Sequence, residues 1–123
     1  MANSFITNLY PKPTSDKPLR KMTVNSTSDS HSLINSGDDT SGTKIPDGSN
    51  AGAFDKLTKY VVIDVQTADA FVTYSGTKPS ATYQGHRLYA GRSYTWSEAS
   101  ASRALFIKAG TTDSIIYASE FTN

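Results

Sequence analysis

The sequence predicts an all-β fold: a small jelly-roll-like β-sandwich or barrel formed by residues 53–123, preceded by a long extended N-terminal arm over residues 1–52. Two observations favour this organisation. Residues 53–123 hold 32 apolar side chains in 71 positions, whereas residues 1–52 hold only 13. The apolar runs of the second part are short and recur about every ten residues, with no long stretch of helical periodicity.

The expected strands follow one another along the second part. Residues 60–66 alternate, which places Val61, Ile63 and Val65 on one face. Residues 109–113 suit a hairpin loop between the last two strands. No segment could supply the crossover helix of a βαβ unit, so a parallel sheet is not expected. The other strands are expected at residues 70–74, 82–83, 87–89, 93–97, 104–108 and 114–121, with a helical turn at residues 97–103.

The arm is polar, above all between residues 25 and 50. Such a composition buries too little apolar surface to offset the cost of ordering the backbone, roughly 1–2 kcal/mol per residue. We therefore expect a partner protein or a neighbouring copy to hold it, with an arm wrapped on its own domain as the alternative. Removing residues 1–24 is expected to abolish partner binding and leave the domain folded. The expected anchors are Phe5, Ile6, Leu9, Tyr10, Leu19, Arg20, Met22, Val24, Leu33 and Ile34.

Charge and composition argue against several classes of partner. The formal net charge is +1, and the four cations between residues 12 and 21 are diluted by Asp16, so a nucleic-acid partner is not expected. The absence of cysteine excludes disulfides and thiolate metal sites. The longest apolar runs, such as residues 60–63, are far shorter than the roughly 20 residues of a membrane span, and the N-terminus lacks a signal-peptide pattern. A soluble protein is therefore expected.

No motif predicts catalysis. The segment Gly37–Lys44 resembles a phosphate-binding loop, but a threonine separates its second glycine from the lysine. The aspartates nearby lack the spacing of a calcium loop. His31 and His86 belong to no metal-binding pattern. We therefore expect no enzyme, no cofactor, and neither catalytic nor metal-binding residues.

The second part carries a succession of short motifs: a strand, an Ala-Gly-x-Ser turn, another strand and a final hairpin. These motifs occupy residues 61–65, 71–76, 85–96, 104–110 and 115–121. Together they resemble small β-sandwich proteins of bacteriophage virions, particularly the capsid decoration (cement) proteins of tailed phages. The resemblance covers roughly the last 65 residues and rests on overall pattern, so it transfers no functional residue.

The resemblance implies a structural virion protein, assembled in the host cytoplasm and often trimeric, that binds between major capsid protein subunits. The arm would then lie over the major capsid protein or other virion subunits. Two alternatives stay open. One is a head–tail connector, tail or fibre component. The other is a carbohydrate-binding module that uses Tyr74, Tyr83, Tyr94 and Trp96 as a stacking platform.

Overall fold

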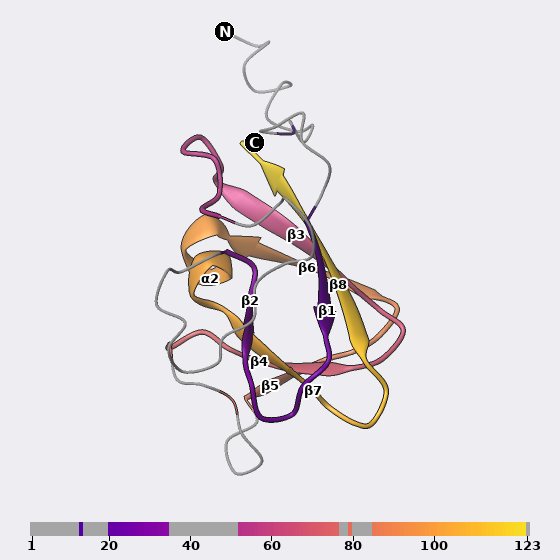
Figure 1. Ribbon diagram of the computed structural model, residues 1–123. Coiled ribbons are helices and arrows are strands. Elements are labelled where there is room, and N and C mark those ends of the chain that lie inside the picture. Colours follow the sequence, from indigo (N-terminus) through magenta and orange to yellow (C-terminus); the bar gives the residue numbers. More distant parts are fainter. Residues whose placement is uncertain (1–12, 14–19, 35–51, 77–78, 80–84, 123) are drawn as a thin grey trace, which may run out of the picture.

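The computed structural model describes residues 13, 20–34, 52–76, 79 and 85–122, and these form two facing antiparallel sheets (Figure 1). The all-β prediction is confirmed, and the architecture is that of a β-sandwich. The expected strand at residues 82–83 lies outside the described residues. The described elements are β1 (Arg20–Val24), β2 (His31–Ser32), β3 (Tyr60–Gln66), β4 (Ala70–Thr73), β5 (His86–Leu88), β6 (Arg92–Ser97), α2 (Glu98–Arg103), β7 (Leu105–Lys108) and β8 (Ser114–Phe121).

Each sheet has four described strands. The first sheet, called sheet A, has the order β1-β8-β3-β6, and sheet B has the order β2-β7-β4-β5. Every neighbouring pair is antiparallel. Among the described strands, only β4 and β5 are consecutive in the chain and also share a sheet. The chain therefore crosses between the sheets at almost every connection.

This crossing corrects the expected hairpin at residues 109–113. That loop joins β7 of sheet B to β8 of sheet A, so the two strands do not pair with each other. Lys108 Nζ lies 3.1 Å from Asp113 Oδ1 and 3.3 Å from the carbonyl oxygen of Thr111, which closes the loop across its base. A short loop between two apolar strands fits either connection, and the sequence pattern does not distinguish them.

The core lies between the sheets. In β3 the side chains of Val61, Ile63 and Val65 are buried, whereas those of Tyr60, Val62 and Asp64 are half-buried and that of Gln66 is exposed. Helix α2 closes one end of the sandwich and contributes Ala101 to the core. The helix begins at its N-cap Ser97, whose hydroxyl accepts a hydrogen bond from the amide of Ser100. No helix among the described residues has the length and apolar character that a membrane crossing requires.

The domain boundary expected after residue 52 is wrong for residues 20–34. β1 pairs with β8 along its whole length, and β2 pairs with β7. Met22, Val24 and Leu33 are fully buried in the core. Truncation at residue 24 would therefore remove a strand from the sandwich, contrary to the expectation that the domain would stay folded. Residues 20–34 therefore belong to the sandwich and not to an arm.

Candidate interaction surface

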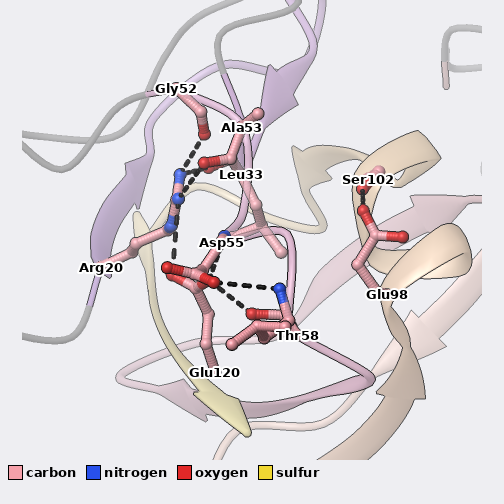
Figure 2. A network of polar contacts seen from close by, with 10 residues as sticks. Arg20, Leu33, Gly52, Ala53, Asp55, Thr58, Glu98, Ser102 and Glu120 are labelled. Atoms are coloured by element: carbon pink, nitrogen blue, oxygen red, sulfur yellow. Dashed lines mark hydrogen bonds and ion pairs between the residues drawn. The ribbon is translucent and has the colours of Figure 1, made fainter. Parts of the chain in front are cut away.

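The side chain of Arg20 ties together three segments of the chain at one end of the sandwich (Figure 2). Its Nη1 donates to the carbonyl oxygens of Leu33 at 2.8 Å and Gly52 at 2.5 Å, and its Nη2 donates to that of Ala53 at 3.0 Å. Leu33 and Gly52 lie close to the two ends of the undescribed segment 35–51. One guanidinium therefore holds the chain on both sides of that segment.

Glu120 extends the same network from β8. Its Oε2 lies 3.5 Å from Arg20 Nη2, and its Oε1 accepts hydrogen bonds from the amide of Asp55 and the hydroxyl of Thr58, both at 2.8 Å (Figure 2). The Arg20 guanidinium also lies 4.6 Å from the ring centroid of Phe54. Burial lowers the pKa of Arg20 from its ordinary value, and the charge of Glu120 opposes that shift. The network therefore fixes the loop before β3 against β1 and β8.

That loop presents an apolar side chain to solvent. The carboxylate of Asp55 accepts from the amide of Leu57 at 2.9 Å, and the Asp55 carbonyl accepts from the amide of Thr58 at 3.0 Å. Leu57 is 68% exposed at the tip of this turn. A contact made by Leu57 would cost little conformational entropy, because the turn is already ordered by Glu120.

An aromatic pair lies on sheet A beside this turn. The rings of Tyr60 and Phe121 stack with centroids 5.3 Å apart and an interplanar angle of 14°. The amide of Lys59 donates to the carbonyl of Phe121 at 2.9 Å. Pro13 forms an antiparallel bridge with Phe121. Pro13 therefore lies alongside the C-terminal end of β8.

The outer face of sheet A continues from this pair. Tyr60 and Val62 of β3, with Ile115 and Tyr117 of β8, are half-buried and alternate with core residues. The outer face of sheet B differs, because its large apolar side chains at positions 71 and 107 are buried. Sheet A therefore offers the more accessible apolar face of the sandwich.

A second aromatic group, which includes Tyr94 and Trp96 of β6, packs against the core. Trp96 stacks on Phe106 with centroids 6.0 Å apart, and Tyr74 meets it edge-on at 5.1 Å. Tyr94 lies 6.4 Å from Trp96, and its hydroxyl accepts from the amide of Tyr89. Burial, with a smaller contribution from Tyr94, raises the pKa of Tyr74 to about 12. These rings pack mainly against one another and against the core.

A shallow hollow of about 210 Å³ lies at the opposite end of the sandwich, between residues 68–69 and 109–112. Asp69 and Arg87 line it and form an ion pair at 2.8 Å. Asp69 Oδ1 also accepts from the amide of Ala90 at 2.8 Å. These hydrogen bonds, with that of Ala90 the strongest influence, lower the pKa of Asp69. The pair holds the β5–β6 connection against the turn that follows β3.

The ten expected anchors fall into three groups in the structure. Arg20, Met22, Val24 and Leu33 are buried in the sandwich, so their side chains are not available to a partner. Ile34 packs against the core cluster. Phe5, Ile6, Leu9, Tyr10 and Leu19 lie outside the described residues.

Both histidines lie among the described residues. His31 is buried, with its Nε2 3.2 Å from the side-chain oxygen of Asn25, and His86 is exposed beside the Tyr74 ring. Within the described residues, no three His, Asp or Glu side chains gather as metal ligands would.

Sequence reasoning missed Leu57 and Glu120. An isolated leucine in a polar loop carries no periodic signal, and the partners of Glu120 are up to 100 residues away in the sequence. Tyr117 could have been found, since the alternation of residues 114–121 places it opposite the core positions.

Comparison with known proteins gives no relative. No family model, curated protein or solved structure matches this chain.

Proposed function

We propose that this chain is a structural protein of a virion, a capsid decoration protein built as a jelly roll. The observation that carries the proposal is the strand order, β1-β8-β3-β6 facing β2-β7-β4-β5. In this order the first strand lies next to the last in one sheet, and the second lies next to the seventh in the other. Eight strands wound in this way are typical of the jelly roll, an architecture used by viral capsid proteins, lectins and cupins.

The end of the sandwich described above supports an attachment role. Pro13 bridges Phe121 at the C-terminal end of β8. From the Pro13 bridge, residues 1–12 could reach at most about 43 Å if fully extended. We propose that residues 1–19 bind the major capsid protein or other virion subunits through Phe5, Ile6, Leu9, Tyr10 and Leu19.

Shell binding tests this attachment. The full chain and a variant carrying Phe5→Ser and Ile6→Ser would be added to purified shells of the source virus that lack the protein. The apolar loss should raise the Kd for the shell by at least about tenfold and so lower occupancy at subsaturating concentration, because each large apolar side chain contributes about 1.5–3 kcal/mol when fully buried. A Ser4→Ala and Thr7→Ala variant is the matched control and should bind as the full chain does. Equal occupancy of all three proteins would refute the attachment.

A connector, tail or fibre role shares the same architecture and differs in stoichiometry. Decoration proteins cover the shell in large numbers, whereas connectors and tails follow the low-order symmetry of a single axis. The accessible face of sheet A and the exposed Leu57 suit either assembly. Copy number per particle therefore separates the two roles.

A carbohydrate-binding role receives less support from the side chains. Sugar stacking needs an open ring face, but Trp96 stacks on Phe106 and is met edge-on by Tyr74. Tyr83 lies outside the described residues. Glycan-array binding that is lost in a folded Trp96→Ala variant would restore this alternative.

A further inference from the structure

Three residues form a row across the outer face of sheet A. Tyr117 of β8 is paired in register with Lys21 of β1 on one side and with Asp64 of β3 on the other. Residues opposite each other in antiparallel strands project to the same face. Adjacent strands lie about 4.8 Å apart, so the cation and the anion are separated by about 10 Å across the tyrosine.

Each member of the row is accessible. Lys21 is exposed, and Tyr117 and Asp64 are half-buried. Asp64 accepts a hydrogen bond from the hydroxyl of Ser93 on its other side. The row therefore has a positive end, an aromatic centre and a negative end.

Apolar side chains surround the row. Val62 lies two residues before Asp64 on β3, and Ile115 lies two residues before Tyr117 on β8, so both are on the same face as the row. Of the described helices and strands, none packs on this face, since α2 and sheet B both lie on the core side. Apolar and aromatic side chains with charges at the margin are typical of a protein interface.

We propose that this face binds a second copy of the chain, sheet against sheet, about a two-fold axis that runs parallel to β8. This axis places Tyr117 against the partner's Tyr117. It also exchanges the two sides of the row, so that Lys21 faces the partner's Asp64 and Asp64 faces the partner's Lys21. A two-fold axis perpendicular to the strands would instead set Lys21 against the partner's Lys21, and charge repulsion disfavours it.

A two-fold contact gives a dimer or an assembly of dimers, in place of the trimer that the resemblance to decoration proteins implies. The contact belongs to the isolated chain and does not depend on a virion partner. Shell binding can therefore fail while the dimer forms, and the dimer can fail while shell binding persists.

Sedimentation equilibrium of the full chain at micromolar to millimolar concentration tests the contact. The unaltered chain should form a dimer. Lys21→Glu and Asp64→Lys should each weaken dimerisation by about 100-fold or more, because each substitution creates two like-charge pairs across the axis. Arg103→Glu makes the same charge change at the exposed end of α2, which lies on the core side of sheet A, and should leave the dimer unchanged.

Mixing the two weakened variants supplies the decisive observation. In a 1:1 mixture, the new carboxylate at position 21 of one variant would face the new ammonium group at position 64 of the other. The unaltered Asp64 of the first variant would likewise face the unaltered Lys21 of the second. A heterodimer should therefore form at concentrations where each variant alone is monomeric. Thermal melts would check that both variants are folded. A monomeric or trimeric parent chain, or a mixture no more associated than its components, would overturn the proposal.

Discussion

Arg20 and Glu120 join the first described strand to the last, with Nη2 and Oε2 3.5 Å apart across a sequence separation of 100 residues. The pair lies at the edge of the core, and both partners make further hydrogen bonds to the loop before β3. The same interaction therefore joins the first and last described strands and holds the exposed turn at Leu57 in place. Substitution of Arg20 or Glu120 should therefore lower the stability of the domain and the order of that turn.

Replacing Arg20 with methionine should destabilise the domain by about 2–4 kcal/mol. The methionine keeps much of the buried volume but leaves the carbonyls of Leu33, Gly52 and Ala53 without their donor, and Glu120 without its cation. Urea denaturation would measure the change. Arg103→Met, at the exposed end of α2, should stay within about 0.5 kcal/mol of the parent. Equal effects of the two substitutions would contradict the role assigned to Arg20.

Two truncations should separate the arm from the sandwich. A chain that begins at Pro13 should keep the circular-dichroism spectrum and cooperative unfolding of the full protein. A chain that begins at Asn25 loses β1, with Met22 and Val24 of the core, and should not fold cooperatively. Cooperative unfolding of the shorter chain would restore a domain boundary C-terminal to β1.

Gly85 and Gly91 form a matched pair for a backbone test. Both have positive φ, +80° and +85°. A Cβ at Gly85 would overlap the carbonyl oxygen of Val72 and lie 2.8 Å from Cγ2 of Thr73, whereas one at Gly91 would have nothing within 4 Å. Gly91→Ala should cost about 1 kcal/mol from the backbone conformation alone. Gly85→Ala should cost about 3 kcal/mol or more in urea denaturation, and similar values would contradict the close approach of Gly85 to β4.

Stability should fall at alkaline pH through Tyr74. Its folded pKa of about 12 exceeds the ordinary value of 10, because burial disfavours the phenolate. The unfolded chain therefore loses this proton first. The contribution of the protonated Tyr74 side chain to the unfolding free energy is complete below pH 10 and is lost as pH rises toward 12. Partial exposure of the ring limits the effect to about 1 kcal/mol. The difference in unfolding free energy between the parent and Tyr74→Phe should narrow over this range, and a constant difference would argue against it.

The parts of the fold that local pattern determines could be predicted. β3 alternates over its seven residues and β8 over its first six, and both strands occupy the expected positions. β1 was not predicted, because its five residues lie in a polar part of the sequence. Met22 and Val24 were therefore interpreted as anchors of an extended arm. Its burial comes from pairing with β8, a contact between distant parts of the sequence.

The candidate surface was predictable only in part. The outward positions of β8 follow from alternation, and with them Tyr117. The charge row with Lys21 and Asp64 depends on the strand order and register, which sequence periodicity does not specify. The same holds for the connection between β7 and β8, since a short loop permits either pairing or crossing.

Quantitative mass spectrometry of purified particles of the proposed virus tests the proposed virion role most directly. The copy number of this chain would be measured against that of the major capsid protein in the same particles. The account predicts a copy number in the hundreds, in fixed proportion to the capsid subunits. Absence from the particles would contradict a virion role, and a count of six or twelve would replace decoration with a connector or tail position.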